Sequence, residues 1–127
     1  MADELAQLVC IIDDDANIRD IYQRKFLQSG YDVISGANGE EGLTAIRKRK
    51  PDIILLDIQM PIKDGVEVIK ELQADVDLRR IPVIILSNVD DEVMYKKIGN
   101  LDATKFYLVK SLVTPQKVVD TVEEVLQ

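Results

Sequence analysis

Reactive side chains follow four short apolar runs of this sequence. The triplet Asp13-Asp14-Asp15 comes directly after LVCII, and Asp57 comes after IILL. Ser87 and Lys110 follow two later runs of the same kind. Carboxylates that gather in one place repel one another, and a shared proton or a hard cation relieves that repulsion. Because the chain has no histidine, oxygen ligands here favour Mg²⁺ or Mn²⁺ over zinc or copper.

Such a set of groups suits phosphoryl transfer. A metal held by few protein ligands keeps positions for phosphate oxygens, while Lys110 supplies a second positive charge and Ser87 a hydroxyl donor. Positioning and charge neutralisation do most of the catalytic work in this chemistry, and an aspartate can itself be the nucleophile. Taken singly, each residue has an ordinary explanation, such as a helix cap for Asp15.

The elements that must position these groups alternate along the chain. Runs of four or five residues rich in β-branched types predict strands over 8–12, 31–35, 53–56, 82–86 and 105–109. The first, third and fourth are nearly all apolar, as is typical of central strands of a parallel sheet. The second and fifth alternate more, which suits edge strands.

Five amphipathic helices are predicted between and after these strands. Their apolar positions, in order, are Ile18, Ile21, Tyr22 and Phe26; Leu43 and Ile46; Val66, Ile69 and Leu72; Val93, Met94 and Ile98; and Val118, Val122 and Val125. The signals for their ends are Gly30 as a stop, Asn38 with Glu41 and Asp64 with Glu67 as capping boxes, and Asp90 and Thr114-Pro115 as starts.

Strict alternation with right-handed crossovers predicts an α/β fold, a (βα)5 doubly wound parallel sheet in a three-layer sandwich. Ligands of such sheets bind at the carboxyl ends of the strands. Four of the five strands therefore deliver a polar or charged group to one edge, and the second ends without comparable chemistry.

Composition excludes several classes of function. The 127 residues carry 16 Lys and Arg against 23 Asp and Glu, a net charge of -7, which disfavours direct binding of nucleic acid or an anionic membrane surface. Apolar runs of about five residues are too short for membrane insertion. The single Cys10 excludes an internal disulfide and indicates a reducing, cytoplasmic location. We expect one domain over 1–127, with a core of about 8–126 and no output domain.

The motifs resemble the receiver domain of two-component response regulators. The matching segments are Ile11 to Arg19 (IIDDDANIR), Ile53 to Gly65 (IILLDIQMPIKDG), Val83 to Ser87 (VIILS) and Phe106 to Lys110 (FYLVK). The resemblance covers nearly the whole chain and is strongest around Asp57. It implies a flavodoxin-like strand order, 2-1-3-4-5.

The resemblance also implies roles for the site residues. Asp57 is expected to be the phosphoacceptor, and Mg²⁺ to be held by Asp13, Asp14, Asp57 and the backbone carbonyl of Gln59. Lys110 is expected to pair with the phosphoryl oxygens. Because the chain has no histidine, a partner histidine kinase or histidine phosphotransfer protein must present the phosphohistidine.

A switch is implied in the same way. Ser87 is expected to contact the phosphoryl group, and Tyr107 matches the aromatic residue that rotates inward in the family. Phosphorylation is then expected to bias the surface of the fourth helix, fifth strand and fifth helix toward a downstream protein. The resemblance implies a monomer or a phosphorylation-dependent dimer, and a signalling domain rather than an enzyme.

Three positions depart from the usual family pattern. Lys110 is followed by Ser111 where the family has a proline, whose peptide bond is often cis. Asn88 stands where the family carries a small residue. Its larger side chain at the mouth of the site could slow attack by water or restrict the donor, which would change the lifetime of the phosphoryl group. The pair Ala103-Thr104 replaces a usual Gly-Ala.

Two other functions remain open at this point. A phosphatase of the haloacid dehalogenase type has a D-x-D pattern, which Asp13 and Asp15 could mimic, but it needs an acidic pair after the lysine. The acids that follow Lys110 are Asp120, Glu123 and Glu124, all within the last predicted helix. The second alternative is a pseudo-receiver, an interaction module that is not phosphorylated.

Overall fold

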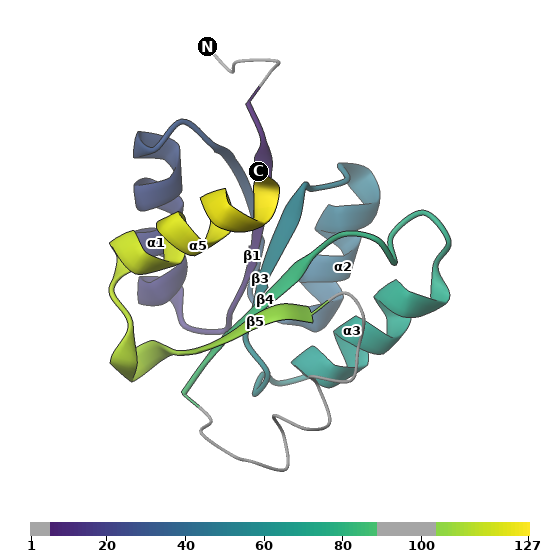
Figure 1. The fold of residues 1–127 in the computed structure, drawn as a ribbon. Helices are drawn as coiled ribbons and strands as arrows, with labels where there is room; N and C mark the ends of the chain where they lie inside the picture. Colours follow the sequence, from purple (N-terminus) through teal and green to yellow (C-terminus); the bar gives the residue numbers. More distant parts are fainter. Residues whose placement is uncertain (1–5, 89–103) are drawn as a thin grey trace.

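A parallel sheet with the strand order β2-β1-β3-β4-β5 forms the centre of the molecule (Figure 1). The computed structural model describes residues 6–88 and 104–127. Its elements are β1 (Leu8–Ile12), α1 (Ala16–Gln28), β2 (Asp32–Gly36), α2 (Gly39–Lys48), β3 (Ile53–Leu56), α3 (Gly65–Ala74), β4 (Val83–Ser87), β5 (Thr104–Val109), the 3-10 helix η1 (Lys110–Leu112) and α5 (Pro115–Leu126). The α/β class and the flavodoxin-like order predicted from the sequence are confirmed.

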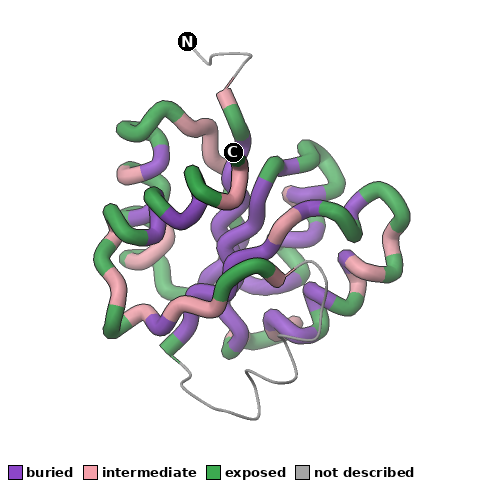
Figure 2. The backbone as a smooth tube through the Cα atoms, in the orientation of Figure 1, coloured by how far each residue is buried: buried purple, intermediate pink, exposed green. Residues whose placement is uncertain are grey.

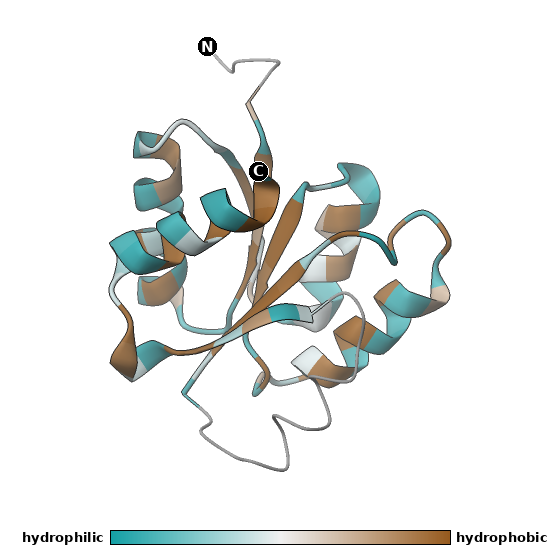
Figure 3. Ribbon diagram, viewed as in Figure 1, coloured by the Kyte–Doolittle hydropathy of each residue, from teal (hydrophilic) through white to brown (hydrophobic). Residues whose placement is uncertain are grey.

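Helices cover both faces of the sheet, with α1 and α5 on one side and α2 and α3 on the other (Figure 1). Side chains of β1 alternate between two hydrophobic cores. Val9 and Ile11 pack with residues of α1 and α5, whereas Cys10 and Ile12 pack with residues of α2 and α3. The central strands β1, β3 and β4 are buried along their length, whereas the edge strands β2 and β5 are partly exposed (Figure 2). Each helix turns its apolar side toward the sheet (Figure 3).

Side-chain caps fix the starts of the helices. The carboxylate of Asp15 accepts hydrogen bonds from the backbone N–H groups of Asn17 and Ile18, at 2.9 and 3.3 Å. Asp64 and Glu67 form the predicted capping box at α3. Asn38 caps α2, because its Oδ1 accepts from Glu41 N at 2.9 Å. The Glu41 carboxylate accepts from the backbone N–H of Ala37, one residue before the cap, so the predicted reciprocal capping box does not form.

Other differences from the prediction are local. Thr114 caps α5 as predicted, and Gly30 follows α1 with a φ of 93°. Strands β2 and β4 each begin and end one residue later than predicted. Ile21, predicted on the apolar side of α1, is 47% exposed, because Tyr22 and Phe26 fill the space against the sheet.

The chain turns tightly after β5. The peptide bond between Lys110 and Ser111 is trans, as are the other peptide bonds of the described residues. The predicted fourth helix, with Asp90, Val93, Met94 and Ile98, and Ala103 lie outside the described residues. In the ranges that the structure describes, no helix is both long and apolar enough to cross a membrane.

Candidate functional site

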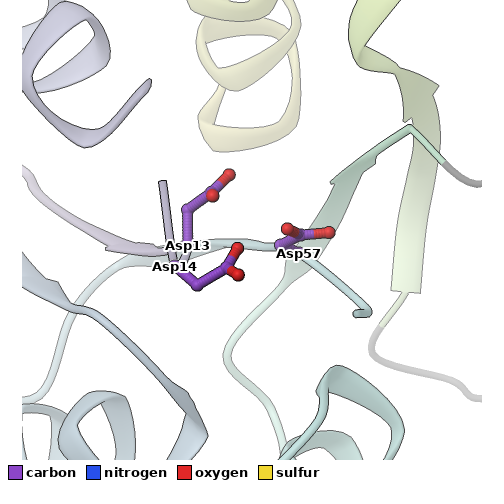
Figure 4. A group of neighbouring side chains, drawn as sticks. All are labelled: Asp13, Asp14 and Asp57. Carbon is purple, nitrogen blue, oxygen red and sulfur yellow. The ribbon is translucent and has the colours of Figure 1, made fainter. Parts of the chain in front are cut away.

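Three carboxylates meet at the carboxyl edge of the sheet (Figure 4). Asp13 and Asp14 follow β1 and Asp57 follows β3, and a hydrogen bond of 2.9 Å from Asp57 N to Ile12 O holds the two strand ends together. Each residue offers one oxygen atom, and these atoms all lie within 4.8 Å of one another. Asp13 and Asp57 are 3% and 6% exposed, whereas Asp14 faces solvent.

Lys110 brings a positive charge into this cluster from the end of β5. Its Nζ lies 2.5 Å from Asp13 Oδ2 and 3.2 Å from Asp57 Oδ2, and its side chain is only 11% exposed. Three carboxylates and one ammonium group leave a net charge of -2 in the cluster. Such a site, with oxygen ligands alone, suits a divalent hard cation such as Mg²⁺.

Burial and pairing act in opposite directions on the pKa values of this cluster. Burial raises the pKa of Asp13 by more than the hydrogen bond and charge of Lys110 lower it. Burial also acts to lower the pKa of Lys110, but the hydrogen bonds to Asp13 and Asp57 and the charges of both carboxylates together outweigh it, so that this pKa is raised. Lys110 is therefore an ammonium group at neutral pH.

Two backbone hydrogen bonds and one side-chain hydrogen bond hold Asp13 in place. Its N–H donates to Gly36 O at 3.1 Å, its carbonyl accepts from Arg19 Nη1 at 2.7 Å, and its Oδ1 accepts from Asp15 N at 2.9 Å. Arg19 and Gly36 are positioning residues that the sequence analysis did not identify. The IIDDDANIR motif contains Arg19, but its contact to a carbonyl six residues earlier depends on the shape of the loop.

Asp15 does not belong to the cluster. Its carboxylate caps α1, whereas the carboxylates that lie close enough together to hold a metal ion are those of Asp13, Asp14 and Asp57. The second acid of a D-x-D motif is therefore committed to the helix start. Asp120 likewise lies within α5, where it accepts from Gln116 Nε2 at 2.9 Å. This arrangement disfavours the haloacid dehalogenase alternative.

The remaining predicted residues lie on β4, on β5 and in the loop after β3. Ser87 ends β4 and is buried, and the exposed Asn88 follows it. Tyr107 lies half-buried on β5, paired with Ile85 of β4. Gln59 borders a pocket of about 620 Å³ whose wall also includes Asp14, Met60 and Lys70.

Comparisons with known proteins agree with this geometry. The model of the response regulator receiver domain matches residues 9–123. A probable transcriptional regulator ycf27 from Porphyridium aerugineum is 35% identical over 119 residues, which cover 94% of this chain and 48% of the relative. The chain thus spans about half the length of the curated relatives it matches.

Solved structures superpose closely. Chemotaxis protein CheY4 of Vibrio cholerae has a TM-score of 0.87 and 26% identity, over 95% of this chain and 99% of that one. The phosphorylated cyanobacterial phytochrome response regulator RcpA has a TM-score of 0.80 and 26% identity, over 94% and 91%. With the acidic cluster and the strand order, these matches show that the chain belongs to the response regulator receiver domains of two-component systems, which are generally phosphorylated on an aspartate.

Proposed function

We propose that Asp57 is the phosphoacceptor of this receiver domain. The observation that carries the proposal is the difference between the two buried carboxylates. Asp13 is engaged by Asp15 N and, at 2.5 Å, by Lys110, whereas within residues 6–88 and 104–127 the Asp57 carboxylate has one side-chain contact, to Lys110 at 3.2 Å. Asp57 thus keeps an oxygen available for attack on phosphorus at the edge of the sheet where ligands bind.

The acidic cluster supports a divalent metal in this reaction. Asp13, Asp14, Asp57 and the backbone carbonyl of Gln59 are proposed to hold Mg²⁺, with Mn²⁺ as a substitute. Bound Mg²⁺ would offset the charge of the phosphoryl oxygens. No ligand other than oxygen is required, which agrees with the residues that the cluster contains.

The transfer itself uses groups of this chain and one of its partner. An Asp57 carboxylate oxygen bonds to phosphorus while the phosphorus–nitrogen bond of the donor's phosphohistidine breaks, and the imidazole keeps the electron pair and takes up a proton. Lys110 is proposed to pair with a phosphoryl oxygen, and Ser87 to donate its hydroxyl to another. The donor is a histidine kinase or a histidine phosphotransfer protein.

The output is proposed to be a protein contact. Tyr107 is half-buried and Phe106 is exposed on the edge strand β5, beside the site that phosphorylation changes. We infer that the face formed by β5, α5 and the predicted fourth helix, which lies outside the described residues, binds a downstream protein in the phosphorylated state. The net charge of -7 disfavours direct binding of nucleic acid. We also propose that the domain is cytoplasmic, is not inserted in a membrane, and is a signalling domain rather than an enzyme acting on other substrates.

Phosphorylation with a small donor tests the proposal. Acetyl phosphate with Mg²⁺ is expected to add one phosphoryl group per chain, measured by intact mass, and Asp57→Asn is expected to remove it. Asp20→Asn, which changes an exposed aspartate of α1, is the matched control. If the Asp57→Asn protein is still phosphorylated at the wild-type rate, another residue is the acceptor. If the wild type takes up neither phosphate nor beryllofluoride, the pseudo-receiver is the better description.

A further inference from the structure

The loop between β3 and α3 contains a strained turn at Ile62. Lys63 N donates to Pro61 O at 2.7 Å, and Ile62 between them has a φ of 70°. This γ-turn is rare, and positive φ is unfavourable for a β-branched residue. The Ile62 side chain is 79% exposed, so that its own packing offers little compensation. Other contacts of the loop must hold the turn in place.

Lys63 makes these contacts. Its carbonyl accepts from Gly39 N at 3.1 Å, at the first residue of α2. Its Nζ lies 3.0 Å from Glu40 Oε2 and also pairs with Glu71 of α3, which lies 3.5 Å from Arg47 Nη2. Hydrogen bonds to Glu71 and Glu40 raise the pKa of Lys63, and the bond from Lys63 lowers that of Glu71. The ion pairs therefore persist throughout the neutral range.

The backbone contact between Lys63 and Gly39 leaves no space for a side chain. A Cβ atom at residue 39 would lie 2.5 Å from Lys63 O and 2.6 Å from Val68 Cγ2. The loop that carries Asp13 is attached to the same connection, through Asp13 N and Gly36 O at 3.1 Å. Residues 36–39, between β2 and α2, thus contact both the loop after β1 and the loop after β3. They supply no reactive group themselves.

We propose that Lys63 is a positioning residue for the metal site, which holds the strained loop so that the Gln59 carbonyl and Asp57 stay aligned with Asp13 and Asp14. The inference rests on the proposed function, because it places the metal at this cluster. Lys63 lies six residues after Asp57 along the loop, and its ion pairs tie that loop to α2 and α3. A residue that orients a metal ligand typically changes affinity by about ten- to a hundredfold when it is removed.

Mg²⁺ affinity separates positioning from simple stabilisation. Calorimetric titration with Mg²⁺, checked by the Mn²⁺ electron paramagnetic resonance signal, is expected to show about tenfold weaker binding for Lys63→Met. Lys63→Arg, which keeps the charge, should restore most of the affinity. Lys48→Met removes an exposed lysine of α2 and should bind as the wild type does.

A second substitution tests the role of strain. Glycine accepts positive φ without steric strain, so Ile62→Gly should reduce the dependence of the loop conformation on the contacts of Lys63. The double variant Ile62→Gly/Lys63→Met is therefore expected to recover Mg²⁺ affinity relative to Lys63→Met alone. If Lys63→Met does not fold, Glu40→Gln takes its place, because it removes the more exposed partner only.

The outcomes are distinct. If the wild type binds Mg²⁺ and is phosphorylated, but Lys63→Met binds Mg²⁺ equally well, Lys63 is only a structural ion pair, even if the melting temperature falls. If the double variant binds as weakly as Lys63→Met, strain at Ile62 plays no part. If the wild type itself binds no Mg²⁺, it is the proposed function that fails.

Discussion

Lys110 Nζ lies 2.5 Å from Asp13 Oδ2, so that the residue after β5 is joined to the residue after β1 across the sheet edge. The same ammonium group reaches Asp57 Oδ2 at 3.2 Å. One cation thus stands between two buried anions, and any metal or phosphoryl group that enters the cluster changes this balance.

Lys110→Met should destabilise the metal-free protein. Without the ammonium group, the carboxylates of Asp13 and Asp57 stay buried and unpaired, and the free energy of unfolding should fall by about 3 kcal/mol. Added Mg²⁺ should restore part of this loss, because it supplies the missing charge. Urea titrations followed by circular dichroism, with EDTA and with Mg²⁺, give both values. Lys117→Met, in the first turn of α5, should change stability by less than about 0.5 kcal/mol. An equal loss in EDTA and in Mg²⁺ would argue against a shared charge balance.

Asp14→Asn should separate metal binding from folding. Asp14 is exposed, so its replacement should leave stability in EDTA nearly unchanged, while the loss of one anionic ligand should weaken Mg²⁺ binding at least about tenfold. Calorimetric titration measures the affinity. Asp15→Asn is the matched control, since asparagine caps a helix as well as aspartate does. Equal weakening in both variants would mean that net charge, rather than coordination, determines the affinity.

The ion pair between Arg49 and Asp32 should give a pH-dependent contribution to stability. The two groups are 2.6 Å apart, and the hydrogen bond from Arg49 holds the pKa of Asp32 below its ordinary value of 3.8. The contribution is therefore complete above pH 3.8 and is lost as the pH falls through the lowered pKa. Arg49→Met should cost about 0.5 kcal/mol at pH 6, and the difference from wild type should shrink toward pH 3. Urea titrations at several pH values test this, with Arg24→Met, which breaks an exposed pair, as the comparison. A difference that grows on acidification would contradict the assignment.

Cys10 should be unreactive in the folded protein. It is fully buried in β1, and burial raises the pKa of its thiol to about 12, so that only about one molecule in ten thousand carries a thiolate at pH 8. Alkylation by iodoacetamide should require opening of the sheet, and Mg²⁺ should slow it by stabilising the folded state. Mass spectrometry of timed samples gives the rate. Rapid labelling that Mg²⁺ does not change would show that β1 is accessible without unfolding.

Much of the fold could be predicted because its signals are local. The apolar runs of β1 and β3 have the predicted bounds, and Asp64 and Thr114 cap helices three residues ahead of their partners. Ile21 was misplaced because helical spacing does not say how wide the buried side of a helix is. The order of the strands came from the resemblance, since alternation alone does not fix it.

The site could be predicted in part for a different reason. Parallel strands bring their carboxyl ends to one edge, so Asp13, Asp57 and Lys110 had to meet once the order was known. The support around them could not be foreseen. Lys63 contacts Glu40 and Glu71 on two helices, and nothing in the local sequence identifies those partners. The roles of Ser87 and Tyr107 in switching stay predictions.

The alternation of β1 side chains divides the interior into two compartments with separate tolerance to change. Val9 and Ile11 contribute only to the compartment under α1 and α5, and Cys10 and Ile12 only to that under α2 and α3. The second compartment lies beneath α2 and α3, the helices whose residues Glu40 and Glu71 form ion pairs with Lys63. The first compartment lies beneath α1 and α5, which take no part in those ion pairs. Substitutions that reshape α1 or α5 for a new binding partner can therefore leave the packing under the β3–α3 loop unchanged, provided that Arg19 keeps its contact to Asp13. In this chain, the packing behind a partner-binding surface on α1 or α5 is thus separate from the packing beneath the loop that follows Asp57.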